Sequence, residues 1–124
     1  MARFVSYAPF DIDTVNLYWY YAYGTDSLLE KNVNLTVDGQ TYPDLFWTQG
    51  NDGYDHLELD FLGSGIAQDS LGNITAGTVN FVAEFDLNAN LYRWYAEGIS
   101  SDAVAIYNAA LTPSNSDEIY LIQT

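Results

Sequence analysis

Residues 56–62 read His-Leu-Glu-Leu-Asp-Phe-Leu, and apolar and polar side chains alternate through most of this stretch. A period of two places Leu57, Leu59 and Phe61 on one face of an extended strand and the acidic side chains on the other. Antiparallel sheets that bury one face and leave the other in water have this pattern. The stretch therefore predicts a strand of an antiparallel sheet.

Similar alternation recurs on both sides of this strand. Five further segments are expected to be strands: residues 3–8, 32–38, 41–48, 75–86 and 91–97. Asp38-Gly39 is a strong signal for a hairpin turn between the second and third of them. Because Pro43 has no backbone N–H, the strand after that turn is expected to lie at an edge or to begin late. Gly63-Ser-Gly65 predicts a break or a bulge after the central strand.

Near the N-terminus the apolar spacing is that of a helix. We expect a helix that is capped by Asp11 or Asp13, runs to about Tyr23 and is followed by Gly24. The run 15–23 is also rich in Tyr, Trp and Val, which favour strands as well.

After Gly98 the period changes to helical again. Ser100-Ser-Asp102 offers an N-cap, and apolar residues at helical spacing predict a helix over 103–111 that ends before Pro113. A second short helix is expected from Ser114 or Ser116 through Ile122. The sequence thus predicts an α+β fold: an antiparallel sheet of about six strands, with an early helix and two C-terminal helices packed on one face.

The chain is strongly acidic and has no cysteine. Seventeen Asp and Glu residues face three Lys and Arg residues, which gives a formal net charge of −14 over 124 residues. This balance argues against nucleic acid and anionic lipid as partners, because both require clustered basic side chains. No run of apolar residues is long enough for membrane insertion. With 48% hydrophobic residues, we expect 1–124 to fold as a single domain, the N-terminal part of a longer secreted protein.

The loop at residues 50–58 is the segment closest to a metal-binding motif. It matches the calcium nonapeptide G-G-x-G-x-D-x-U-x at four positions, with Asn51 in place of the second glycine. Calcium is the expected cofactor on this interpretation, and Asn51, Asp52 and Asp55 would supply oxygen ligands. A polar hairpin loop is the alternative, because ions in that architecture lie between successive copies of the repeat.

Aromatic side chains and the single histidine form a second group of candidates. Tyr and Trp are enriched at binding surfaces and suit carbohydrate or another small ligand. The candidate ligand-binding residues are Tyr18, Trp19, Tyr42, Trp47, Tyr54 and His56. The alternative is that the aromatic residues pack the core, and that the histidine is a solvated residue on the polar face of its strand.

Residues 63–79, Gly-Ser-Gly-Ile-Ala-Gln-Asp-Ser-Leu-Gly-Asn-Ile-Thr-Ala-Gly-Thr-Val, and the segment 99–108 carry a family pattern. Together they resemble the N-terminal domain of bacterial RTX proteins, the hemolysin-type calcium-binding proteins. The resemblance implies type I secretion without an N-terminal leader, an extracellular location, and calcium-binding repeats downstream of this segment.

The chain is also similar, more weakly, to secreted hemophores. The opening Met-Ala-x-Phe-Val-x-Tyr, Asn34-Leu-Thr36 and the strand around 59–61 carry this similarity. The hemophore fold is implied, but heme as a cofactor is not. Val37 stands where that family has its heme-ligating tyrosine, and the early helix region has no histidine.

These observations favour a non-catalytic module with a surface-attachment or ligand-binding role. No Ser-His-Asp arrangement, phosphate loop or dinucleotide fingerprint is present in the sequence. One alternative is a hemophore-like heme carrier that uses His56 with Tyr54 or Tyr42. Another is an accessory or catalytic domain acting on polysaccharide, which predicts two carboxylates facing one cleft and a raised pKa on one of them.

Overall fold

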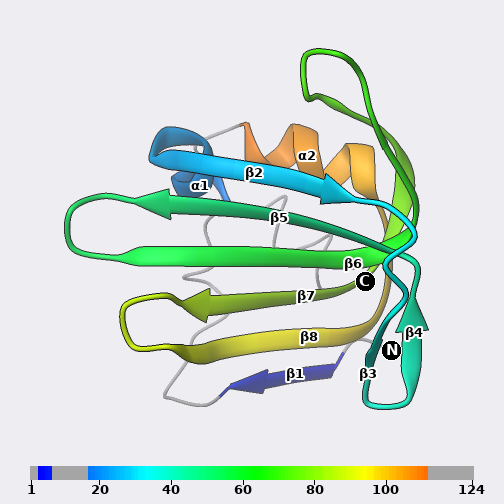
Figure 1. The fold of residues 1–124 in the computed structure, drawn as a ribbon, viewed down its shortest axis with the longest axis horizontal. Coiled ribbons are helices and arrows are strands. Elements are labelled where there is room, and N and C mark those ends of the chain that lie inside the picture. Colours follow the sequence, from blue (N-terminus) through cyan, green and yellow to red (C-terminus); the bar gives the residue numbers. More distant parts are fainter. Residues whose placement is uncertain (1–2, 7–16, 112–124) are drawn as a thin grey trace.

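The computed structural model describes residues 3–6 and 17–111, and its main element is a six-stranded antiparallel sheet (Figure 1). The strand order is β1-β8-β7-β6-β5-β2. The bounds of these strands are β1 Arg3–Ser6, β2 Gly24–Glu30, β5 Asp44–Asn51, β6 His56–Gln68, β7 Ile74–Asp86 and β8 Leu91–Asp102. A separate two-stranded hairpin consists of β3 (Leu35–Val37) and β4 (Gln40–Tyr42), and the helices are α1 (Tyr18–Ala22) and α2 (Ala103–Ala110).

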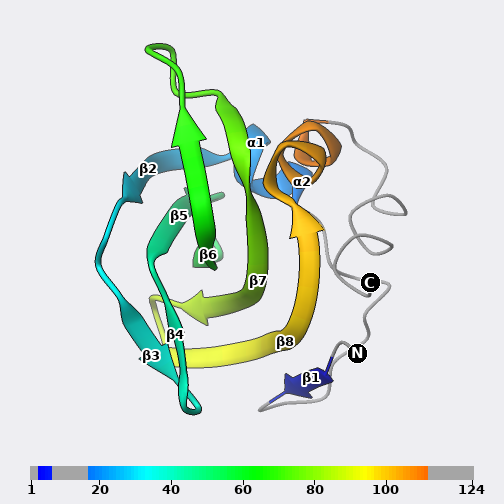
Figure 2. The ribbon, with the colours of Figure 1, turned by 90° about the vertical axis from the view of Figure 1, so that its right-hand side faces the viewer.

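The main sheet is strongly curved, and the other elements lie on its two sides (Figure 2). Both helices lie on one side, where α2 packs mainly on β7 and α1 on β5. The β3–β4 hairpin lies on the opposite side. Among the described residues, no helix has the length and apolar character needed to cross a membrane. The expected α+β architecture, with a mostly antiparallel sheet, an early helix and a C-terminal helix, is confirmed.

The set of strands in the sheet differs from the prediction. The Asp38-Gly39 turn is confirmed, with both residues at positive φ (51° and 81°). The prediction of a single strand over 41–48 was wrong, because the chain leaves the hairpin at Pro43 and continues as β5 in the main sheet. The place beside β5 is taken by β2, which the sequence pattern did not predict.

The helices agree with the prediction in kind rather than in length. The early helix has five residues, and its N-cap position, Leu17, makes no side-chain cap hydrogen bond. The expected caps Asp11 and Asp13 lie outside the described residues, as does the second C-terminal helix expected through Ile122. α2 begins as predicted, with the Asp102 carboxylate accepting a hydrogen bond from the Val104 N–H at 2.9 Å.

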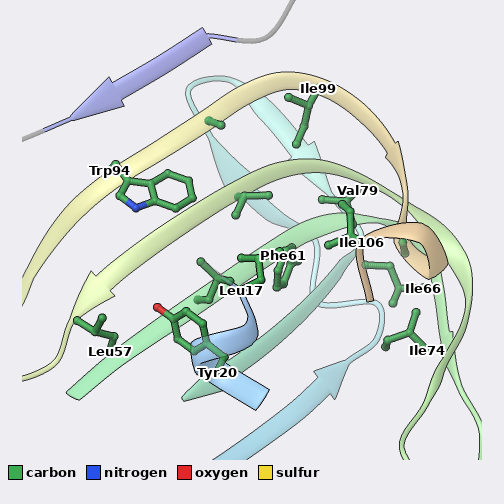
Figure 3. Close-up of a cluster of buried hydrophobic side chains, with 14 residues drawn as sticks. Leu17, Tyr20, Leu57, Phe61, Ile66, Ile74, Val79, Trp94, Ile99 and Ile106 are labelled. Carbon is green, nitrogen blue, oxygen red and sulfur yellow. The ribbon is translucent and has the colours of Figure 1, made fainter. Parts of the chain in front are cut away.

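The alternation of residues 56–62 divides the core between two faces. On the helix side, Leu57, Leu59 and Phe61 of β6 join residues of α1 and α2 in one buried cluster. Figure 3 shows Leu17 and Tyr20 of the α1 region on the same side as Phe61, and Ile106 of α2 beside Val79 of β7. On the opposite side a smaller cluster lies under the β3–β4 hairpin, formed by Tyr42, Leu62, Phe81 and Ala83.

The long strands β6 and β7 bend without separating. The Gly63-Ser-Gly65 segment is a bulge, as expected, because the pairing register shifts at Leu62/Gly63 and again before Ala67. A Cβ at Gly63 would collide with the carbonyl oxygen of Thr78, so this crossing of two backbones requires glycine. Beyond the bulge both strands continue toward the helices.

Candidate ligand-binding site

A cavity of about 470 Å³ lies between the two helices and the helix side of the sheet. This volume falls within the range of about 300–1,000 Å³ that is typical of small-molecule sites. Most of its described walls are apolar or aromatic: Leu17, Tyr20, Tyr21, Phe46, Leu59, Phe61, Ile66, Ile74, Val79, Ala103, Ile106, Tyr107, Ala110 and Leu111. Several of these side chains are labelled in Figure 3.

The α1 wall is held against β5 by an aromatic contact. The ring of Trp19 lies directly over Gly50, where an added Cβ would be 2.6 Å from Trp19 Cζ3. The Trp19 indole N–H donates a hydrogen bond to Asp52 Oδ2 at 3.2 Å, and its ring meets Tyr20 edge-on at 4.9 Å between centroids. A glycine on β5 therefore gives α1 room to approach, and this approach places Tyr20 at the cavity.

The α2 wall is tied to the tip of the β6–β7 hairpin. The Tyr107 hydroxyl donates a hydrogen bond to Asn73 Oδ1 at 2.8 Å. Asn73 is itself fixed by Asp69, whose carboxylate accepts from the Asn73 backbone N–H and from its side-chain amide. Gly72 and Ile74, on either side of Asn73, contribute to the cavity wall. The residues just after the hairpin turn thus close one side of the cavity, while the turn itself projects beyond the sheet (Figure 1), with Leu71 85% exposed.

A buried polar cluster anchors Tyr20. Its hydroxyl donates to Glu84 Oε2 at 2.5 Å, while Glu84 Oε1 accepts from the Trp94 indole at 3.1 Å and pairs with Arg93 at 3.2 Å. Burial and the Glu84 charge raise the pKa of the Tyr20 phenol well above its usual value. Tyr20 consequently offers its ring to the cavity, while its hydroxyl is already engaged.

A second buried cluster supports the end of the cavity near Ile66. The Asp44 carboxylate is almost fully buried (1% exposed) and accepts from Lys31 Nζ at 2.8 Å, from Asn32 N–H and from Ile66 N–H. Burial acts to raise the pKa of Asp44, but these hydrogen bonds outweigh it and lower the pKa below its usual value. Sequence reasoning did not single out Asp44.

The polar part of the cavity wall comes from two neighbouring strands. Thr25, Asp26 and Ser27 of β2 and Thr48 of β5 line it, and Ser27 pairs directly with Thr48 across the strands. Thr25, Asp26 and Ser27 are exposed to solvent. The cavity therefore has an apolar interior and a rim with the Ser27 and Thr48 hydroxyl groups, whereas Asp26 pairs with Gln49 and so directs its side chain to the other face of the sheet.

The predicted calcium ligands lie in the β5–β6 loop, where they make hydrogen bonds within the loop. Asn51 Oδ1 accepts from the Gly53 N–H, and Asp52 Oδ1 accepts from the N–H groups of Tyr54 and Asp55. Within the described part of the chain, no group of three or more His, Asp or Glu side chains is arranged to hold a metal ion. The geometry is that of a self-capped polar turn, and calcium binding stays a prediction.

The predicted aromatic and histidine residues do not gather at one place. Tyr18 and Trp19 lie on α1, on the helix side. Tyr42 is buried against Phe81 on the opposite side of the sheet, and Trp47 lies on that side beside Asp60. Tyr54 is 90% exposed in the β5–β6 loop. His56 begins β6 and alternates with Leu57, so it lies on the side of the sheet away from the cavity.

Two carboxyl groups, Glu58 and Asp60, lie side by side on the face away from the cavity. Burial, the Glu58 hydrogen bond and charge, and the charge of Glu30 raise the pKa of Asp60 to about 8. Asp60 Oδ1 is buried and has no hydrogen-bond partner in the part of the chain described. Gln49 holds the other member of the pair, donating to Glu58 Oε1 at 2.8 Å.

Comparisons with known proteins identify no relative of this chain. No protein-family model, no curated protein and no solved structure matches this chain.

Proposed function

We propose that this domain is a non-catalytic binding module that holds a small, mainly apolar molecule in the cavity between α1, α2 and the sheet. The observation that carries the proposal is the cavity itself, about 470 Å³ in volume with an apolar interior and a short polar rim. Burying apolar ligand surface there would contribute about 25 cal/mol per Å². The rim hydroxyls would orient the ligand rather than supply most of its affinity.

The supports of the cavity favour a preformed site. Hydrogen bonds from Tyr20 to Glu84 and from Tyr107 to Asn73 hold both helical walls. The Lys31–Asp44 pair holds the Ile66 end. A site that is rigid before the ligand arrives avoids the entropy cost of ordering its walls on binding. We therefore expect little change in backbone structure when the ligand enters.

We also propose that the protein is secreted and carries calcium-binding repeats. The resemblance of residues 63–79 and 99–108 to RTX N-terminal domains supports a secreted bacterial protein with calcium-dependent repeats downstream. In that setting a module that captures a small molecule outside the cell is consistent with the ligand-binding role expected from the sequence. Surface attachment through the same domain would use other faces.

Titration with Nile red, an uncharged apolar dye whose fluorescence rises in apolar surroundings, tests the proposal. We expect one site with a dissociation constant in the micromolar range. Ala110→Phe should fill the α2 side of the cavity and weaken binding by tenfold or more. The matched control is Asn108→Phe, which places the same ring on an exposed position of the same helix that does not line the cavity.

Equal binding by wild type, Ala110→Phe and Asn108→Phe would contradict the proposal, because the dye would then be bound elsewhere. Circular dichroism of each variant should show an unchanged sheet spectrum. If Ala110→Phe does not fold, Thr48→Trp fills the cavity from β5 and carries the same expectation.

A further inference from the structure

Three hydroxyl groups of the cavity wall are already engaged as donors. The hydroxyls of Tyr20 and Tyr107 donate to Glu84 and Asn73, respectively. The Thr25 hydroxyl donates to a backbone carbonyl oxygen of β5 at 3.4 Å. These donors hold the walls to the rest of the sheet and are not available to a ligand.

The hydroxyl groups of Ser27 and Thr48 are placed differently. Neither of them makes a hydrogen bond within the part of the chain that the structure describes. Ser27 pairs with Thr48, and Thr48 pairs with Leu59 of the buried cluster, so both side chains lie on the cavity side of the sheet. Directly opposed residues of antiparallel strands have Cβ atoms about 4.5–5.5 Å apart. One ligand atom can therefore reach both hydroxyl groups.

The surroundings of this pair make its hydrogen bonds matter. Thr48 is half-buried, and Phe46, Leu59 and Phe61 line the cavity on the same and the next strand. A ligand that fills this apolar space displaces water from the Thr48 hydroxyl. If the ligand offers no polar atom there, the hydroxyl loses its partner, which costs free energy. A ligand with an oxygen at this point restores the hydrogen bond.

We propose that Ser27 and Thr48 together select ligands that carry one hydroxyl or carbonyl oxygen at the end of an apolar body. This inference rests on the proposed binding function and names the ligand class of the same cavity. Each hydroxyl side chain donates one hydrogen bond and can also accept. A carbonyl oxygen can accept from both, and a ligand hydroxyl can accept from one while it donates to the other.

Two probes of nearly the same shape test this selectivity: 2-naphthol and 2-methylnaphthalene, which differ by a hydroxyl in place of a methyl group. Each displaces Nile red from the full chain at pH 7, where 2-naphthol is uncharged. The methyl compound reports the apolar contacts alone. The ratio of the two dissociation constants therefore isolates the contribution of the hydroxyl group.

Variants of the pair identify the groups that read this oxygen. Thr48→Val keeps the shape of the side chain and removes its hydroxyl, so it should weaken 2-naphthol about fivefold and leave 2-methylnaphthalene within about twofold. Ser27→Ala should act in the same direction, and its exposed position keeps the test available if Thr48→Val does not fold. The matched control is Thr75→Val, which removes an exposed hydroxyl of β7 that does not line the cavity and should change neither constant.

The outcomes distinguish this inference from the proposed function. If Nile red binds at the cavity but both variants bind 2-naphthol as tightly as the wild type, or lose affinity for both probes equally, the selectivity is overturned while the binding function stands. If Thr75→Val weakens 2-naphthol as much as Thr48→Val does, the effect does not come from the cavity and the role of the pair is overturned. If Nile red does not bind at all, the proposed function fails and the inference fails with it.

Discussion

Replacing Asp60 by Asn should stabilise this protein at alkaline pH. Asp60 lies between Trp47 of β5 and Ala83 of β7, next to Glu58, and one of its oxygens is buried without a partner among the described residues. Asparagine keeps the size of the side chain but carries no charge. It can also donate to Glu58 where the ionised carboxylate would repel it.

The magnitude follows from proton linkage. Folding raises the pKa of Asp60 from 3.8 to about 8, so the folded state holds a proton that the unfolded state has lost. The stability contributed by the protonated carboxyl is complete below about pH 4 and is lost as the pH rises toward about 8. The full shift corresponds to about 6 kcal/mol. Since the ionised side chain can turn toward water, and since the titration is divided between Asp60 and its neighbour Glu58, we expect about 2–3 kcal/mol.

Urea unfolding between pH 5 and pH 9 is the appropriate assay. The carboxyl groups whose pKa is lowered, such as Asp44, do not change the stability over this range. Their stabilising effect is complete above about pH 4 and is lost only at lower pH. The wild type should lose about 2–3 kcal/mol across the range, whereas Asp60→Asn should change much less. The control Asp55→Asn removes one exposed charge and should follow the wild type.

Parallel pH curves for wild type and Asp60→Asn would refute the reasoning. So would a variant that is less stable than the wild type at pH 9, because the amide would then be replacing a favourable carboxylate.

Three further perturbations test the supports of the cavity and the charge balance. Lys31→Met should lower the free energy of unfolding at pH 7 by about 2–3 kcal/mol, because it leaves the buried Asp44 without its cation, and adding Asp44→Asn should restore part of the loss in the same urea assay. Gly50→Ala should cost about 1–3 kcal/mol and shift the tryptophan emission, because the new methyl group displaces the Trp19 ring. Raising NaCl from about 20 to about 500 mM should increase the melting temperature by several degrees in calorimetry, because salt screens the repulsion within a chain of net charge −14; an unchanged melting temperature would contradict this.

The central strands could be predicted because their two faces differ in the polarity of their side chains. β6, β7 and β8 each alternate over at least part of their length, and the start of α2 carries a readable N-cap at Asp102. Their full lengths were not predictable from the pattern. Gly63 and Gly98 read as strand ends, but in the structure the chain continues through both as strand, with Gly98 at a φ of 70°.

The sequence pattern predicted neither β2 nor the cavity, and the reason is physical. Gly24–Glu30 is an edge strand that is exposed over its first five residues, so burial imposes no alternation on its side chains. The cavity is formed where this strand, two helices and a distant hairpin tip meet. No local sequence signal marks such a meeting, since each wall residue looks like an ordinary core residue in its own segment.

The charge of the chain nevertheless connects composition to the site. The strong excess of acidic residues argues against nucleic acid as a partner, because the sequence has only three Lys and Arg residues. The structure adds that each of these side chains pairs with an acidic residue of a neighbouring element: Arg3 joins β1 to β8, Lys31 joins the end of β2 to β5, and Arg93 joins β8 to β7. None of the three basic side chains lines the described walls of the cavity, so the cations of this chain stabilise the structure around the proposed site rather than contact its ligand.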